Sequence, residues 1–457
     1  MKKTNFDFDL IVLGSGAGGS AAANIACKNG LKVAIVESDI FGGESPNYGD
    51  IPRKAMLNAA HTFFLARRAS KFGVRSSTLG YNFPSVAAWK RLVVKRTGAD
   101  DNTDFYEKQG VKTFRGNARF ITPNEVSVNR QHLSADNFII ATGSKIALPD
   151  IKNLENVPYH TPRTILDVMR PPKSIFIVGG GTEAIEIAQL LAIFGTKVYI
   201  SEISSRLLPQ EDEEVGLSIE NTLVEDMKIF VLPQTRVVAV EKEGLSKKVI
   251  FQRGGTEKFI KVDEILIAGG RAPNTDIGLE NAAVEYNDEG IVVNEFLQTS
   301  NKNIYAAGSI LGNKFTTSDI LLQSRVCANN ILKPRAKVSP DYTASPRTIF
   351  TWPEVASVGL TEDDCMRRDL QFKTSIAPLN LIARGNTDNF KTGFVKLICD
   401  KHGKILGGSV VAPEAASIIH EIGIAARYNL YASDLADLPH AFLSWNEAVR
   451  IAANRIR

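Results

Sequence analysis

The sequence has few cysteines and no long apolar segment. Its four cysteines, Cys27, Cys327, Cys365 and Cys399, are scattered along 457 residues, and no two have the spacing of a redox pair or a metal site. Scattered single cysteines suit a reducing cytoplasm and are typical of small buried residues. We therefore expect a cytoplasmic protein without a metal centre. The absence of any run of about 18 apolar residues argues against an integral membrane segment.

The charge balance argues against one class of partner, nucleic acid. The formal net charge is +4 and the pI is about 8.7, a bias too mild at this length to indicate a nucleic-acid-binding protein. With 44% hydrophobic and 23% charged residues, the composition is that of a globular protein. The length predicts roughly three domains. Residues 1–7 lead directly into a predicted strand, and the apolar run at 10–13 is too short for a signal peptide.

A first dinucleotide-binding motif lies near the start of the chain. A predicted strand at 10–13 is followed by a glycine turn, a helix-like stretch at 20–27 and a second strand at 33–36. The spaced glycines of the turn are Gly14, Gly16 and Gly19. Glu37 ends the second strand, where a carboxylate can accept hydrogen bonds from a ribose 2′-OH. Strand, turn, helix, strand and acid together predict a dinucleotide site.

The same pattern occurs a second time in the middle of the chain. A predicted strand at 174–178 precedes Gly179 and Gly181, and Ala184 takes the third glycine position, as the motif permits. The next predicted strand, at 197–200, is followed by Glu202. A carboxylate there favours a free ribose 2′-OH over a 2′-phosphate, so we predict NADH rather than NADPH. Arg206 weakens this preference unless it is simply a solvated surface residue.

Two dinucleotide sites in one chain imply two dinucleotides, and the simplest chemistry is hydride transfer between a nicotinamide and a flavin. With these two motifs, several further segments resemble the flavoprotein disulfide reductases, the family of lipoamide dehydrogenase, glutathione reductase and mercuric reductase. The similar segments cover most of the chain and are residues 42–54, 139–144, 265–275, 304–309, 348–362, 393–397 and 405–408.

The resemblance implies an α/β fold with two Rossmann-like dinucleotide-binding domains and a C-terminal α+β dimerisation domain. We expect a split FAD domain at 1–150 and 271–335, an NAD(H) domain at 151–270, and the dimerisation domain at 336–457. The partner is then a second copy of the chain, since each subunit's C-terminal segment completes the other's site in the family. A helix is predicted at 60–70.

The resemblance also adds residues to both cofactor sites. The further FAD positions that it implies are Gly42, Gly43, Ala141, Thr142, Gly143, Gly308 and Ser309. Gly270 is added to the NAD site. Lys54 and Glu186 match the family's ion pair beside the flavin, where a lysine stabilises the negative charge that develops on reduction. The family usually has aspartate at the position of Ser309, so flavin affinity is expected to be weaker here.

The chain departs from the family where the redox disulfide would lie. Ser45 and Asp50 occupy the positions of the two cysteines, and neither side chain can form a disulfide. Asp50 has two interpretations. It could exchange protons beside the flavin, or it could cap the following helix or pair with Arg53, which is the favoured interpretation.

A second departure lies near the C-terminus. Phe442 occupies the position of the family's catalytic histidine, and Leu443 that of the proline after it, so a cis peptide there becomes costly and the turn should change. Glu447 is kept, while His440 is displaced by two positions. Loss of the base is consistent with loss of the cysteines, because a base that serves a thiolate has no task without it.

Three functions remain open from the sequence. The first is an FAD-dependent NAD(P)H oxidoreductase that reduces a small-molecule, non-disulfide acceptor such as a quinone, for which Phe442, Leu443 and Trp445 would make the former thiol pocket apolar unless they only fill the interface. The second is a soluble pyridine nucleotide transhydrogenase, against which Glu202 argues. The third is a non-catalytic nucleotide-binding protein, against which the retained Lys54 and Glu186 argue.

Overall fold

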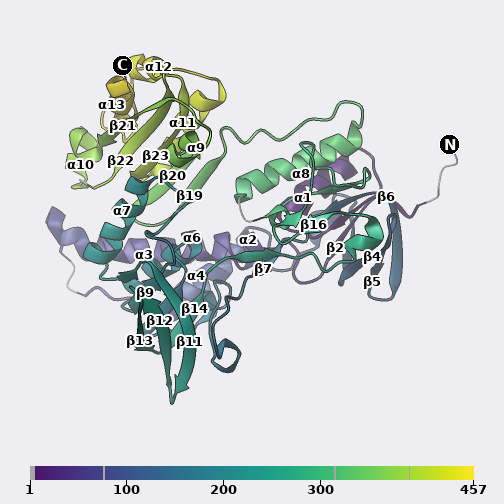
Figure 1. Cartoon of the computed structure of the whole chain (residues 1–457), viewed down its shortest axis with the longest axis horizontal. Helices are drawn as coiled ribbons and strands as arrows, with labels where there is room; N and C mark the ends of the chain where they lie inside the picture. The colour runs from purple at the N-terminus through teal and green to yellow at the C-terminus, as the bar shows by residue number, and fades with distance from the viewer. Residues whose placement is uncertain (1–5, 76–77, 313–314, 391, 457) are drawn as a thin grey trace. The chain divides into compact units, whose positions relative to one another are not determined.

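The computed structural model describes residues 6–75, 78–312, 315–390 and 392–456. The chain divides into two compact units, each assembled from three stretches of sequence (Figure 1). Unit 1 comprises Met1–Arg53, Ala88–Leu148 and Gly270–Asp341, and unit 2 comprises Lys54–Ala87, Pro149–Gly269 and Tyr342–Arg457. The boundaries of the three expected domains stay a prediction. Of the predicted approach to the first strand, residues 1–5 lie outside the described residues.

A largely parallel sheet forms the core of unit 1. Its order is β3-β2-β1-β6-β5-β4, and the second half of the long strand β6 also pairs with β18. β1, β2, β3, β6 and β18 are parallel, whereas β4 and β5 form an antiparallel extension. The bounds are β1 Phe8–Leu13, β2 Val33–Glu37, β3 Lys112–Arg115, β4 Ala118–Thr122, β5 Glu125–Val128, β6 Gln131–Ile140 and β18 Ile304–Ala306.

The apolar runs at 10–13 of β1 and 33–36 of β2 are explained by burial on both faces of this sheet. Helix α1 connects the two strands and packs against α8. The other elements of unit 1 are short and lie mainly in connections. The bounds are α1 Ala17–Lys28, α2 Glu44–Asn47, α5 Asp104–Glu107, α8 Thr317–Leu332, β7 Ser144–Ile146, β15 Arg271–Pro273, β16 Tyr286–Asn287, β17 Gly290–Ile291, η5 Leu279–Ala282 and η6 Ser309–Leu311.

Unit 2 contains a second parallel sheet, in the order β10-β9-β8-β14, and a three-stranded antiparallel sheet. This arrangement repeats the strand–turn–helix–strand unit of β1, α1 and β2 with β8, α6 and β9. The bounds are β8 Ser174–Val178, β9 Lys197–Ser201, β10 Phe230–Leu232, β14 Glu264–Ile267, β11 Thr235–Glu243, β12 Ser246–Arg253, β13 Thr256–Val262, α6 Thr182–Ile193, α7 Glu213–Asn221, η2 Leu154–Asn156, η3 Ile165–Asp167 and η4 Thr222–Asp226.

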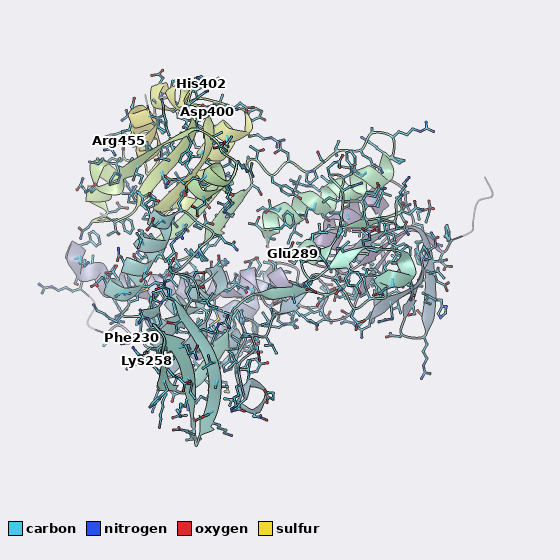
Figure 2. The ribbon with its side chains drawn as sticks, in the orientation of Figure 1. Phe230, Lys258, Glu289, Asp400, His402 and Arg455 are labelled. Carbon is cyan, nitrogen blue, oxygen red and sulfur yellow. The ribbon has the colours of Figure 1, made fainter. Side chains whose placement is uncertain are left out.

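The C-terminal part of unit 2 is a five-stranded antiparallel sheet, in the order β19-β20-β23-β22-β21, with helices. At the β22–β23 turn, Asp400 accepts the backbone N–H groups of His402 and Lys404 (Asp400 and His402 are labelled in Figure 2). The bounds are β19 Pro346–Ile349, β20 Glu354–Gly359, β21 Phe372–Pro378, β22 Phe394–Asp400, β23 Ile405–Ala412, α9 Glu362–Arg367, α10 Ala383–Thr387, α11 Ala415–Arg427, α12 Ala432–Asp437, α13 Glu447–Ile456 and η7 Leu379–Leu381. The predicted fold class is confirmed.

Two further helices contain points at which the chain passes from one unit to the other: α3 (Asp50–Arg68) and α4 (Phe83–Arg96). The helix predicted at 60–70 is confirmed up to Arg68, but it begins ten residues earlier than expected. The next four residues form the 3-10 turn η1 (Ala69–Phe72).

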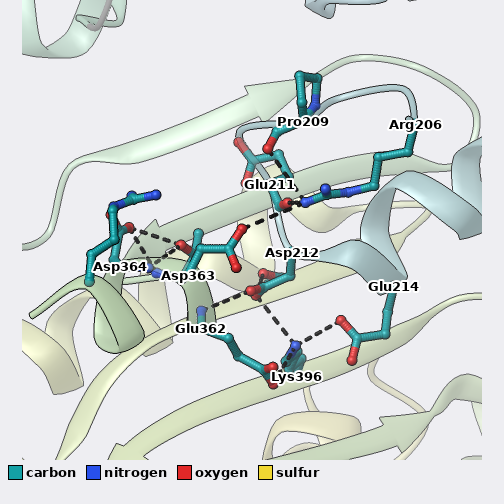
Figure 3. Close-up of polar contacts among 12 residues, drawn as sticks. Arg206, Pro209, Glu211, Asp212, Glu214, Glu362, Asp363, Asp364 and Lys396 are labelled. Carbon is teal, nitrogen blue, oxygen red and sulfur yellow. Dashed lines mark hydrogen bonds and ion pairs between the residues drawn. The ribbon is translucent and has the colours of Figure 1, made fainter. Parts of the chain in front are cut away.

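A buried ionic network holds α7 against the antiparallel sheet within unit 2 (Figure 3). Lys396 of β22 is 1% exposed, and its ammonium lies 2.7 Å from Glu214, 2.8 Å from Glu362 and 3.7 Å from Asp212. Burial opposes the charged form of Lys396, but the hydrogen bonds to Glu214 and Glu362 and the attraction of Asp212 together raise its pKa. The lysine is therefore a charged part of the core, compensated by carboxylates.

Candidate dinucleotide sites and the former disulfide position

The first glycine turn connects β1 to α1 and lies in close contact with two other segments of unit 1. A Cβ on Gly14, whose φ is +103°, would lie 2.2 Å from the carbonyl oxygen of Ala141. A Cβ on Gly18 would lie 2.7 Å from the oxygen of Ala307, and one on Gly43 would lie 2.5 Å from the Cα of Gly16. Three other segments therefore lie against this turn: residues 141–143, residues 307–309 and Gly43. This proximity is expected if the four segments form one cofactor site.

Glu37 folds back onto this turn. Its carboxylate is buried, and one oxygen accepts the backbone N–H of Ser15 at 2.9 Å and the Ser15 hydroxyl at 2.7 Å. The other oxygen accepts the N–H of Asp39 at 2.9 Å. An ionised carboxylate accepts about four hydrogen bonds, so these three leave capacity for a ribose hydroxyl.

The beginning of α1 suits a pyrophosphate. Gly16 is the N-cap residue and has no side chain, so no side-chain cap occupies the N–H groups of Ala17 and Gly18 at the start of the helix. A 12-residue helix places partial positive charge at this end. The residues thus fit a dinucleotide: a turn without Cβ atoms, backbone donors at a helix N-terminus, and an acid at the end of the second strand.

Gly308 and Ser309 lie at the end of β18. Gly308 has φ +98°, and its N–H donates to the side-chain oxygen of the buried Gln323 at 2.8 Å. Ser309 is the first residue of η6. Gln323 supports the strand end from α8, and no sequence motif indicated this role.

The second glycine turn repeats the geometry of the first in unit 2. Gly179 has φ +115°, and a Cβ there would lie 2.5 Å from the oxygen of Ala268. Glu202 accepts the N–H of Gly180 and that of Ser204, each at 2.8 Å. Gly181, the N-cap of α6, would have no atom within 4 Å of a Cβ. This turn also fits a dinucleotide.

Three other residues that the sequence analysis considered for the NAD site lie in different surroundings from one another. Ala184 is buried in α6, where it packs in the core of unit 2. Gly270 falls within unit 1 and has φ +142°. Arg206 is not a solvated residue: its guanidinium donates to the carbonyl oxygens of Glu211 at 2.7 Å and Pro209 at 3.4 Å (Figure 3). These bonds hold Arg206 on its own loop, so it is not poised to bind a 2′-phosphate.

Lys54 and Glu186 form the expected pair, from α3 and α6 of unit 2. Lys54 Nζ lies 3.0 Å from Oε2 of Glu186, whose side chain is 0% exposed. Oε1 of Glu186 accepts the N–H of Phe350 at 2.8 Å, and the ammonium lies 5.2 Å from the centre of the Phe350 ring. Phe350, which lies just after β19, therefore orients the acid and shields the pair. Sequence reasoning missed it, although it lies in the similar segment 348–362.

The former disulfide position is occupied by a hydrogen-bonded ionic network within unit 1. The Ser45 hydroxyl donates to Oδ2 of Asp50 at 2.8 Å, and the Thr317 hydroxyl donates to the same oxygen at 3.0 Å. Arg53, only 3% exposed, lies 3.2 Å from the other oxygen, which confirms the favoured interpretation of Asp50. Asp50 is also the first residue of α3, where a carboxylate is favoured by the helix dipole. Each of these three partners donates a hydrogen bond to Asp50, which suits an ionised carboxylate.

The C-terminal positions correct part of the sequence interpretation. Phe442 is 76% exposed, and Leu443 has φ +66° and follows a trans peptide, so the turn has changed as expected. Trp445 is a core residue: it is 4% exposed, belongs to the hydrophobic core of the C-terminal part of unit 2 and contacts Phe390 edge-on. Large aromatic side chains are often buried in this way, and the sequence could not distinguish a core position from a pocket.

His440 has partners of its own. Its Nε2 lies 2.7 Å from Glu421 and its Nδ1 lies 2.8 Å from the carbonyl oxygen of Leu438. Glu447, retained from the family pattern, accepts the N–H of Leu443 instead of orienting a histidine. Glu421 replaces it as the acid beside an imidazole.

Two nucleotide-type glycine turns on two parallel sheets, followed by an antiparallel sheet with helices, define a two-dinucleotide oxidoreductase. Residues 8–326 match the family described as "Pyridine nucleotide-disulphide oxidoreductase", and residues 345–453 match its "dimerisation domain". This chain belongs to the pyridine nucleotide-disulphide oxidoreductases, the flavoprotein disulfide reductase family that the sequence resembles. Members of this family use FAD and NAD(P)H.

Individual relatives cover nearly the whole chain. Mercuric reductase of Staphylococcus aureus is 33% identical over 451 residues, which are 98% of this chain and 82% of that protein. Dihydrolipoyl dehydrogenase of Bacillus subtilis is 32% identical over 454 residues, 97% of this chain and 95% of that one. The solved structure of the HOCl-induced flavoprotein disulfide reductase RclA from Escherichia coli is 25% identical, with a TM-score of 0.87 over 98% of this chain and all of that one.

Proposed function

We propose that this protein is an FAD-dependent NAD(P)H oxidoreductase that accepts hydride from NADH and passes electrons to a non-disulfide acceptor of the quinone class. The observation that carries the proposal is the contrast between two positions. The Lys54–Glu186 pair is formed, whereas the positions of the redox cysteines hold the Ser45–Asp50 hydrogen bond. The part of the family's machinery that serves hydride transfer is kept, and the part that serves thiols is replaced.

Bound FAD would supply the hydride acceptor and the two-electron store between NADH and the acceptor. The first glycine turn and Glu37 would bind it, with Gly42, Gly43, residues 141–143, Gly308 and Ser309. The second turn and Glu202 would bind NADH, and the unavailability of Arg206 supports NADH over NADPH. This last point also disfavours a transhydrogenase.

In unit 2, Lys54 supplies positive charge that Glu186 and Phe350 hold in place. Asp50 supplies a fixed negative charge and not a proton, because Ser45, Thr317 and Arg53 all donate to its carboxylate. Quinones suit this arrangement, since they accept a hydride or electrons without a thiol. We also propose that the protein forms a homodimer through residues 336–457 and acts in the cytoplasm.

The test is anaerobic stopped-flow absorbance of the flavin-loaded protein mixed with NADH. Rapid flavin bleaching without a long-wavelength thiolate–flavin band is expected, and a dihydrolipoyl dehydrogenase run in parallel supplies the positive control for that band. Lys54→Met should slow bleaching, whereas Lys302→Met, at an exposed position, should not. A soluble quinone should then restore the oxidised spectrum, and lipoamide should not. Absence of bleaching, or purification without flavin, would refute the proposal.

A further inference from the structure

Two sets of contacts in unit 2 connect the same three elements: α3, α6 and the segment that follows β19. The first set, described above, consists of Lys54, Glu186 and Phe350. The second set consists of His61, Gln189 and Trp352. On α3 the second set lies seven residues, about two turns, beyond the first, and on α6 it lies three residues beyond. The two sets are therefore neighbours on the same faces of both helices.

The hydrogen bonds of the second set have a defined direction. Gln189 is 1% exposed, and its amide accepts the Trp352 N–H at 2.6 Å and donates to the Trp352 carbonyl oxygen at 3.1 Å. A backbone N–H can only donate, so these two bonds fix which end of the amide is the oxygen. The Nε2 atom of His61 lies 2.9 Å from that oxygen and must therefore donate to it. Burial lowers the pKa of His61, which favours the neutral imidazole with its proton on Nε2.

The segment after β19 couples the two sets. The Phe350 N–H donates to Glu186 at 2.8 Å, and the Phe350 ring centre lies 5.2 Å from the Lys54 ammonium. Trp352, two residues later, is bonded to α6 through both its backbone groups. A displacement of the segment would break these bonds and leave a buried amide without its partners, which is costly. The second set therefore restrains Phe350 and, through it, the ion pair.

We propose that Gln189 and His61 are positioning residues for the Lys54 ammonium. They act through the backbone of residues 350–352, which they hold against α6. The inference rests on the proposed function, in which the charge of Lys54 assists flavin reduction. A displaced ammonium would stabilise the reduced flavin less well, because electrostatic stabilisation depends on fixed geometry. The simpler alternative, that the second set only stabilises the core of unit 2, predicts a loss of stability without a change in the flavin potential.

The experiment measures the midpoint potential of the flavin in the FAD-loaded full chain, by reduction with dithionite in the presence of a reference dye. A positive charge that stabilises the reduced flavin raises this potential, so Gln189→Met should lower it. The same change should slow bleaching by NADH about ten-fold, since a misplacement of roughly 1 Å can cost about 100-fold. In a Lys54→Met background, adding Gln189→Met should change neither quantity further, because the charge that Gln189 positions is absent.

Two further comparisons separate positioning from stability. His61→Leu should act like Gln189→Met, whereas His61→Gln, which keeps an N–H donor, should retain most of the wild-type potential. Ser357→Ala is the matched control, because Ser357 is 1% exposed in unit 2 and its hydroxyl donates to Glu211 at 2.6 Å. This control should lower stability without changing the potential. If Gln189→Met does not fold, the two His61 variants carry the test.

The inference is overturned if Gln189→Met and His61→Leu leave the potential at the wild-type value, or if they lower it equally in the absence of Lys54. It is also overturned if Ser357→Ala lowers the potential as much. Failure of the proposed function is a separate outcome: a flavin that NADH does not bleach refutes that function, while the potentials still decide the role of the second set.

A chain that does not retain flavin is tested by urea unfolding instead. The losses of unfolding free energy from Lys54→Met and Gln189→Met should then not add, because the two residues act on one network. Additive losses would overturn the inference.

Discussion

Removing Lys54 should destabilise the protein more than neutralising Glu186, although both changes break the same ion pair. At 3.0 Å and an effective dielectric constant of about 20, the attraction is roughly 5 kcal/mol, much of it offset by desolvation. Lys54→Met leaves a carboxylate that is 0% exposed, with the Phe350 N–H still donating to it. We expect a cost of about 3 kcal/mol. Glu186→Gln retains an acceptor for Phe350 and leaves an ammonium that is 23% exposed, so its cost should be about 1 kcal/mol.

The assay is urea unfolding followed by tryptophan fluorescence in a Trp89→Phe background. The two remaining tryptophans, Trp352 and Trp445, both lie in unit 2, so the signal reports the unit that contains the ion pair. The exposed control Lys258→Met should change the unfolding free energy by less than about 0.5 kcal/mol. An equal or larger loss for Glu186→Gln, or a loss near zero for Lys54→Met, would refute the reasoning.

Three further predictions follow from burial. Gly19→Ala should abolish FAD retention, because the new Cβ would lie 2.0 Å from the carbonyl oxygen of Gly14. Retention is measured by flavin absorbance after gel filtration, and retention at the wild-type level would contradict the assignment of the turn. Burial raises the pKa of the Cys399 thiol to about 12, and NADH should not increase thiol labelling of the native protein; an increase would indicate a redox thiol. Burial lowers the pKa of His61, so stability should fall as the pH drops below about 6.5, and His61→Gln should flatten that dependence in urea midpoints measured from pH 7 to 5.

The fold and the two glycine turns could be predicted because their signals are local. Strands such as β1 and β8 contain uninterrupted apolar runs, and each glycine turn lies between a strand and a helix that the sequence already indicates. The carboxylates of Glu37 and Glu202 were placed correctly at the ends of second strands. In both motifs the carboxylate accepts a backbone N–H of the glycine turn, from Ser15 in the first and Gly180 in the second.

The contacts that were missed depend on residues far apart in sequence. Thr317 lies 267 positions from Asp50, and Phe350 lies 164 positions from Glu186. No periodic pattern connects such residues, because they meet only through the packing of separate elements. The prediction for Trp445 failed for a related reason. An indole side chain suits a ligand pocket and a hydrophobic core equally well, and only its packing against Phe390 shows that it belongs to the core.

The replacements at the former disulfide position depend on one another physically. Arg53 is 3% exposed, and the Asp50 carboxylate is one of the groups that compensate its charge. Changing Asp50 alone to cysteine would remove that carboxylate together with the acceptor of the Ser45 and Thr317 hydroxyls. A thiol is a weak acceptor and does not replace a carboxylate at this position. The network therefore opposes the introduction of a thiol at position 50 alone, and this opposition is a physical argument in favour of the proposed non-disulfide acceptor.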